Sequence, residues 1–111
     1  IALASQTNPI PACVLGEACA TSDLPGGVVN ILTGTRDELV PQVATHREID
    51  AVVAVGVSAK EAAALRAGAA ENLKRVAIRE GVEWTRDAAT HGVAWLEPTI
   101  EFKTIWHPSA V

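Results

Sequence analysis

The side chains that most often do chemistry in proteins are few and scattered in this sequence. Its cysteines are Cys13 and Cys19, and its histidines are His46, His91 and His107. Six residues separate the two cysteines, which places them about 240° apart on a helix, so they share no metal-binding face. The histidines lack ligand-like spacing to one another. We therefore predict no metal site and no catalytic residue among them.

The acidic residues do not form a catalytic pair either. Glu80 and Glu83 flank Gly81, while Glu97 and Glu101 lie four residues apart, a spacing typical of a solvated face. No serine, cysteine or lysine has the neighbours of a recognisable nucleophile. From residue types and spacing alone, no catalytic constellation is predicted.

One turn could bind an anion. Gly56, Val57 and Ser58 follow an apolar run and precede a helical pattern, so backbone N–H groups and the positive end of a helix dipole could receive a phosphate there. The dinucleotide pattern G-x-G-x-x-G and the P-loop lysine pattern are both absent. A structural turn is the favoured interpretation, and a phosphate site is the alternative.

Composition limits the classes of function. The chain has 111 residues, 49% of them hydrophobic, with mean hydropathy +0.22 and net charge −4. This length indicates one domain or a piece of one. It has no basic stripe for nucleic acid and no apolar run of the roughly 20 residues that a membrane span needs. It opens without methionine or a signal-peptide pattern, so we expect a segment of a longer, cytoplasmic protein.

Periodicity and turn residues predict alternating helices and strands. Capping boxes at 35–38 and 58–61 indicate helix starts, and residues 102–106 alternate like a half-exposed strand. Residues 81–92 are expected to be irregular, with a helical turn near residue 85. The remaining elements are helices over 11–21, from Thr35 and over 62–72, and strands over 1–4, 28–32, 50–56 and 74–79.

This order predicts the α/β class, with a partial, Rossmann-like parallel sheet of about three strands joined by right-handed connections and a C-terminal arm strand. The strand over 28–32 is expected to be buried. Ligands of such layers bind at the carboxyl ends of the strands, which here are Gly34–Thr35 and Gly56–Ser58.

Five segments, in order, resemble the coenzyme domain of the aldehyde dehydrogenase superfamily. Residues 24–34 (LPGGVVNILTG) are similar to its L-P-x-G-V-x-N-x-x-x-G segment. The other four are residues 5–9 (its K-P-S-E-x-T-P turn), 45–50 (S-H-P-x-V-D), 55–58 (T-G-S-T) and 72–76 (N-L-K-x-V).

The resemblance implies a coenzyme-domain segment over residues 1–81 and NAD or NADP as the family's cofactor. The positions that it assigns to the cofactor are Ser5, Gln6, Gly56, Val57 and Ser58.

Several departures from the family pattern oppose activity. Arg79 stands where the general-base glutamate is expected, and Glu80 would point to the opposite face. Leu3 replaces the lysine that holds the adenosine ribose, and Glu61 replaces the second glycine of G-S-T-x-x-G. The family's nucleophilic cysteine lies in a catalytic domain that nothing after Gly81 resembles. We therefore expect no catalytic residue, no metal and no bound cofactor.

The last part of the chain, 82–111, is interpreted as a connector and a tail. Residues 101–106 (EFKTIW) resemble the family's C-terminal strand Y-T-x-x-K-T-V-W, which belongs to the oligomerisation arm.

The resulting hypothesis is a non-catalytic partner or structural subunit. It would oligomerise with itself or an active homologue through residues 101–106. The alternative is a fragment of an active NAD(P)-dependent aldehyde dehydrogenase, and a third hypothesis is a residual dinucleotide-binding module.

Overall fold

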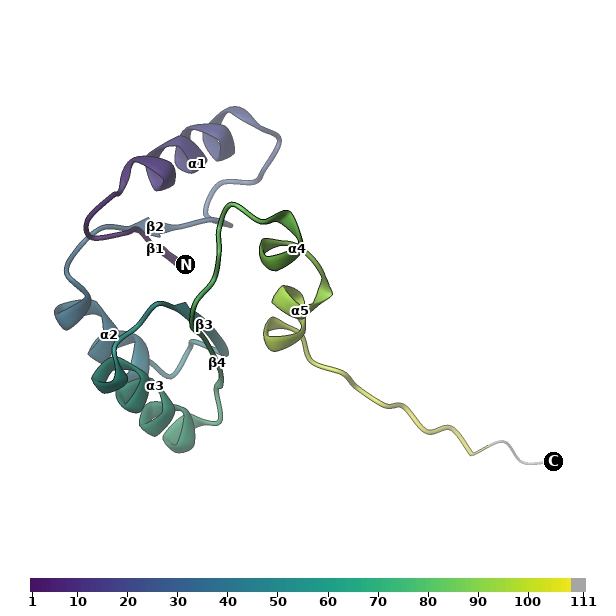
Figure 1. The fold of residues 1–111 in the computed structure, drawn as a ribbon. Coiled ribbons are helices and arrows are strands. Elements are labelled where there is room, and N and C mark those ends of the chain that lie inside the picture. The colour runs from purple at the N-terminus through teal and green to yellow at the C-terminus, as the bar shows by residue number, and fades with distance from the viewer. Residues whose placement is uncertain (109–111) are drawn as a thin grey trace. The chain divides into compact units, whose positions relative to one another are not determined.

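The computed structural model describes residues 1–108 and contains helices joined to short strands (Figure 1). Its elements are β1 (Ala2–Leu3), α1 (Ile10–Thr21), β2 (Ile31–Leu32), α2 (Arg36–Thr45), β3 (Ala51–Val55), α3 (Ala59–Asn72), β4 (Arg75–Arg79), α4 (Asp87–Thr90), α5 (Val93–Leu96) and the 3₁₀ helix η1 (Glu97–Thr99).

The strands pair in parallel, in two separate two-stranded sheets. The chain divides into two compact units, Ile1–Gln42 and the part from Val43 onward. The first unit contains the β1–β2 pair and the second contains the β3–β4 pair. Parallel strands connected by helices confirm the predicted α/β class and are compatible with a partial Rossmann-like fold. The described strands do not join into the single layer of about three strands that the sequence predicted.

In the first unit, the predicted buried strand over 28–32 is wrong for its first three residues. Only Ile31 and Leu32 pair with β1. The preceding residues form a turn instead, since Val28 N–H donates to the Pro25 carbonyl at 3.3 Å and Asn30 Nδ2 donates to the Gly27 carbonyl at 2.7 Å. The Val28 N–H is therefore used within the turn, whereas the Asn30 carbonyl still accepts from the Ala2 N–H at 2.8 Å. Residues 28–30 are exposed.

The second unit follows its predicted pattern closely. β3 and β4 lie within the predicted ranges 50–56 and 74–79, and they pair from Ala51 with Arg75 to Val55 with Arg79. α3 connects them and begins with a complete capping box at Ser58. The residues of both strands are half-buried, except Ala54, which is buried. Two strands and one crossover helix are too few to cover a sheet completely.

A buried lysine joins the end of α2 to the start of β4. The Lys74 side chain is 5% exposed, and its ammonium donates to the carbonyl oxygens of Val43, Ala44 and His46 at 2.7, 2.9 and 2.8 Å. The last carbonyls of a helix have no partner within the helix, and the helix dipole favours a cation beside them. Lys74 therefore caps α2 with all three of its donors.

The backbone of α3 approaches the same end of α2 directly. Gly68 is buried, and a Cβ atom at this position would lie 2.1 Å from the carbonyl oxygen and 2.6 Å from the carbonyl carbon of Ala44. Both are backbone atoms, so a rotamer change cannot make room. A glycine is required here because the two helices touch, and not because of its backbone angles.

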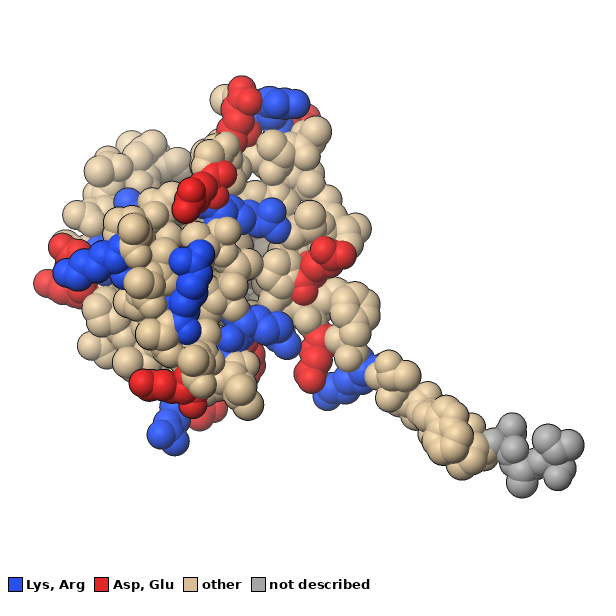
Figure 2. Space-filling view, turned by 60° about the horizontal axis from the view of Figure 1, so that its bottom comes forward, with Lys and Arg blue, Asp and Glu red and all other residues tan. Residues whose placement is uncertain are grey.

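The predicted strand at Phe102–Trp106 is wrong for the described chain. Residues 100–108 contain neither a helix nor a strand (Figure 1), since a strand needs a hydrogen-bonded neighbour and no described residue pairs with this segment. Phe102, Ile105 and Trp106 are 81%, 76% and 82% exposed. Figure 2 shows the segment in tan, apart from charged side chains where it begins. Of the tail prediction for 82–111, residues 109–111 lie outside the described residues.

The connector holds more helix than expected. The predicted helical turn near residue 85 begins two residues later, as α4, and α5 and η1 follow it in a stretch for which no element was predicted. Within residues 1–108, no helix is long and apolar enough to cross a membrane.

We predict that Gly68→Ala destabilises the chain by about 1–3 kcal/mol, because the added methyl group forces the backbones of α2 and α3 apart. Gly16→Ala in α1 is the matched control. Its Cβ would meet only Ile31 Cδ1, at 3.5 Å, so replacing a helical glycine there should be neutral or stabilise by about 0.5–1 kcal/mol. Urea unfolding followed by circular dichroism measures both, and equal shifts in the same direction would refute the close approach.

We also predict that Lys74→Met lowers the free energy of unfolding by about 3 kcal/mol, because buried carbonyl oxygens lose a charged donor while the aliphatic stem is retained. Lys60→Met, in the exposed first turn of α3, is the control and should change stability by less than about 0.5 kcal/mol. Similar losses for the two variants in the same unfolding assay would show that the Lys74 contacts do not stabilise the fold.

Candidate functional site

The turn over residues 56–58 connects the carboxyl end of β3 to α3. Gly56 has φ +61°, a left-handed conformation that favours glycine. Its N–H donates to the Arg79 carbonyl at 3.1 Å, which extends the β3–β4 pairing by one residue. A Cβ at Gly56 would meet no atom within 4 Å, so backbone geometry accounts for this glycine. The turn thus has the position, at the end of a parallel strand, that ligands of α/β layers use.

Glu61 occupies the N-terminus of α3. The Ser58 N–H donates to Glu61 Oε2 at 2.6 Å, and the Glu61 N–H donates to Ser58 Oγ at 3.2 Å. A carboxylate therefore accepts from an N–H group that an anionic ligand at this helix end would use, and its negative charge would repel a phosphate beside it. The capping box and a phosphate site compete for the same atoms.

The two other predicted cofactor residues lie in the first unit. Ser5 Oγ accepts from the Asn8 N–H at 3.1 Å and lies 3.4 Å from Thr7 Oγ1, so it closes a local turn. Gln6 Oε1 accepts from the Arg36 N–H at 3.2 Å, at the beginning of α2. Both side chains stabilise local structure. The assignment of Ser5, Gln6 and the 56–58 turn to a cofactor remains a prediction.

Arg79 ends β4 and contacts the connector. Its guanidinium carbon lies 4.5 Å from the centre of the Trp95 ring, and its Nη2 donates to the Ala94 carbonyl. Sequence reasoning singled out Arg79 but missed both contacts. An available signal was the pair of tryptophans at 84 and 95, two large side chains in a stretch that the sequence predicted to be a connector.

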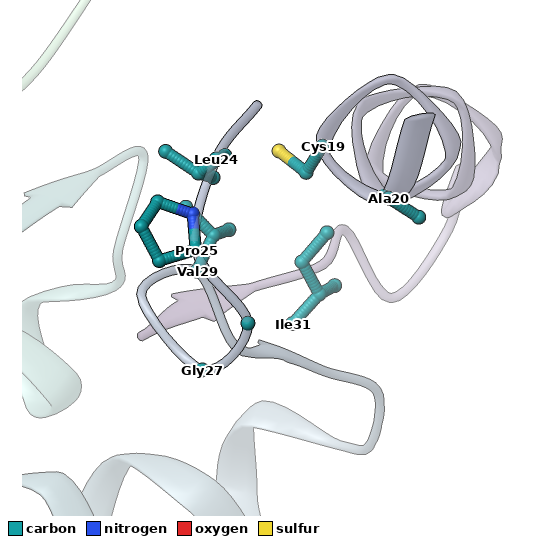
Figure 3. A pocket seen from close by; sticks show the side chains of 9 residues that line it. Cys19, Ala20, Leu24, Pro25, Gly27, Val29 and Ile31 are labelled. Carbon is teal, nitrogen blue, oxygen red and sulfur yellow. The ribbon is translucent and has the colours of Figure 1, made fainter. Parts of the chain in front are cut away.

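The first unit contains a cavity of about 420 Å³ (Figure 3). Gly16, Cys19 and Ala20 contribute from α1, and Ile31 from β2. The segment between these elements supplies the other lining residues, Leu24, Pro25, Gly26, Gly27 and Val29. The lining carries no charged side chain, and both cysteines are free thiols. Among the lining side chains, the cavity therefore offers the Cys19 thiol and no charged group.

No cluster of at least three histidine, cysteine, aspartate or glutamate side chains that could hold a metal ion occurs within residues 1–108. His46 and Glu83, for which the sequence predicted no catalytic or metal-binding role, make local contacts: His46 Nδ1 accepts from the Glu48 N–H at 3.2 Å, and Glu83 forms an exposed ion pair with Arg86 at 3.7 Å. An exposed pair of this kind contributes little to stability.

Parallel strands linked by helices, with a glycine turn leading from a strand into a helix, place the chain in the α/β class and are compatible with a partial Rossmann-like fold. A comparison with protein families gives a more specific assignment than the fold class. A sequence model described as the aldehyde dehydrogenase family matches residues 1–83. The chain belongs to this family.

Curated relatives match over 77 residues. Aminoaldehyde dehydrogenase 2, peroxisomal, from Pisum sativum is 42% identical over 69% of this chain and 15% of its own length. The mitochondrial aldehyde dehydrogenase of Leishmania tarentolae is 33% identical over 69% of this chain and 16% of its own.

The NADP/NAD-dependent aldehyde dehydrogenase PuuC of Escherichia coli (strain K12) is 30% identical, with the same coverage of 69% and 16%. The matched segment is thus less than a fifth of each relative. No solved structure matches the chain.

Proposed function

We propose that this chain is a non-catalytic member of the aldehyde dehydrogenase family, a partner or structural subunit that assembles with itself or with an active homologue in the cytoplasm. The observation that carries the proposal is Arg79. It stands at the position that the resemblance gives to the general base. A guanidinium has donors but no acceptor and stays protonated in proteins, so it cannot take a proton from water or a thiol.

The residues present do not fit NAD or NADP well. The family implies such a cofactor, but the Glu61 carboxylate accepts from the Ser58 N–H at the helix end where a pyrophosphate would lie. Leu3 offers no cation or donor where the family has a ribose-binding lysine. Ser5 and Gln6 are engaged in local hydrogen bonds. These contacts support a form of the protein that has lost cofactor binding.

The exposed tail supports assembly. Phe102, Ile105 and Trp106 are large apolar side chains with 76–82% of their surface exposed, and exposed apolar groups of this size are typical of interaction surfaces. Residues 101–106 have an unpaired backbone among the described residues, which can add as a strand to a sheet edge of another subunit. The resemblance to the oligomerisation arm supports the same use.

The alternative is a fragment of an active NAD(P)-dependent aldehyde dehydrogenase. The short span of 15–16% of the relatives' length favours it, since the nucleophile, the base and the rest of the cofactor site would then lie in other segments. Arg79 favours the non-catalytic proposal, because the substitution would also be present in a longer chain.

We predict that the isolated chain neither binds cofactor nor oxidises aldehydes. Calorimetric titration with NAD and with NADP to millimolar concentration should show no saturable heat, because Glu61 opposes the pyrophosphate. Absorbance at the NADH band should not rise with an aldehyde present. Saturable binding without turnover would support the residual dinucleotide-binding hypothesis, and aldehyde-dependent NADH formation would overturn the non-catalytic proposal.

Assembly through the tail gives a second prediction. Native mass spectrometry should detect an oligomer of the chain, or a complex when an active homologue is supplied, and Ile105→Lys should dissociate it by placing a charge among the apolar contacts. Lys103→Gln, in the same segment, removes a charge that lies 3.9 Å from the Glu101 carboxylate and should leave assembly unchanged. A monomer under both conditions would contradict the proposed use of the tail.

A further inference from the structure

The connector packs back onto the second sheet. We name residues 84–99 the strap: they comprise α4, α5 and η1 with the turns between them. η1 contacts both β3 and β4, and α5 contacts η1. The strap follows the family match, which ends at residue 83. It therefore covers a sheet made of family residues with a segment that the family model does not describe.

Arg79 fastens the strap from the sheet side. Its guanidinium carbon lies 4.5 Å from the centre of the Trp95 ring, within the range of a cation–π contact. Its Nη2 also donates to the carbonyl of the preceding residue, Ala94. The Arg79 side chain thus contacts two adjacent strap residues, the backbone of Ala94 and the ring of Trp95.

The strap is organised around the same tryptophan. The Trp95 indole N–H donates to the Ala89 carbonyl at 3.0 Å, which ties α5 to α4. Trp84 and Trp95 lie 5.8 Å apart between ring centres, with their planes tilted by 37°. Trp84 is 63% exposed, whereas Trp95 is half-buried. Trp95 is therefore the more buried of the two rings, and it connects α4 and α5 to Arg79, while η1 contacts β3 and β4 itself.

The face that the strap covers follows from strand alternation. Arg79 is in register with Val55, and alternate residues of β4 share its face, so Arg75 and Ala77 lie on the same side. The strap lies against this face by way of Arg79. Arg79 Nε has no hydrogen-bond partner within residues 1–108, so the polar attachment rests on Nη2 and the ring contact.

We propose that Arg79 is a latch that holds the strap closed over this face of β3–β4, and that opening the latch frees the strap without unfolding the sheet. Two contacts from one side chain make the closed state dependent on the guanidinium. The sheet itself is stabilised elsewhere, by the Lys74 and Gly68 contacts on α2 and α3. The strap can therefore open as a local unit.

The latch proposal can be tested separately from the proposal that the chain is non-catalytic. Arg79→Glu restores the residue type that the resemblance expects, yet a carboxylate cannot donate to the Ala94 carbonyl, and it is repelled by the negative face of the Trp95 ring. Under the latch proposal, this variant opens the strap whether or not any activity appears. Failure of the latch and failure of the non-catalytic proposal are therefore distinguishable.

The test is hydrogen–deuterium exchange of the full chain, followed by mass spectrometry. In Arg79→Gln, peptides covering 93–100 should exchange about tenfold faster than in the unmodified chain, since the Trp95 and Ile100 amides that donate to Gly92 and Glu97 lose protection. Arg79→Glu should have at least the same effect, and Arg79→Lys, which keeps the charge, a smaller one.

Two controls separate a latch from general destabilisation. Arg75→Gln, on the same strand and face, should leave exchange of the strap within about twofold of the unmodified chain. Peptides from α3 should exchange at unchanged rates in every variant. Unchanged exchange at 93–100 in Arg79→Gln, or equal acceleration in α3 and the strap, would overturn the proposal.

Discussion

The arrangement of β4 and the end of α2 in the second unit depends on the position of the buried Lys74 ammonium group. A buried ammonium is costly unless its donors are all used, and here three carbonyl oxygens at the end of α2 accept from it. The last carbonyls of a helix have no partner within the helix, and Lys74 provides one for Val43 and Ala44. The carbonyl oxygens thus offset the cost of burying the ammonium group, and the ammonium group gives these oxygens a hydrogen-bond donor. Because Lys74 immediately precedes β4, this one contact also determines where β4 begins relative to α2.

Other contacts become possible once that position is set. Gly68 lets α3 touch Ala44, which carries one of the carbonyls that Lys74 caps. Asn72 Nδ2 adds a bond at 3.1 Å to the His46 carbonyl, another of them. The close approach of α3 to α2 and the lysine cap therefore involve the same backbone carbonyls, those of Ala44 and His46. With the start of β4 fixed, five residues of register bring Arg79 to its end beside Val55, opposite the strap.

Local patterns were sufficient to predict much of this unit. The capping box at Ser58 and the apolar run of β3 depend on neighbouring residues, and both were found from sequence. The Lys74 cap and the Arg79–Ala94 contact were not, since Lys74 and Val43 lie 31 positions apart and Arg79 and Ala94 lie 15 apart, and neither residue pattern is distinctive. The strand over 28–32 failed for a local reason: the turn at Pro25–Gly27 uses the backbone groups that pairing would need. The tail alternates like a strand, but no described residue pairs with it.

The cofactor site predicted at the 56–58 turn stays a prediction. The resemblance to the family implies that Glu61 and Arg79 depart from its pattern, and the structure adds the contacts that each side chain makes. Glu61 caps α3 through Ser58, and Arg79 binds the strap. Replacing a functional residue usually leaves an unpaired group that later substitutions can remove. Glu61 and Arg79 both have partners within the described chain, so substituting either one would remove a contact. Under the proposed non-catalytic function, these contacts are a physical reason for the segment to keep both residues.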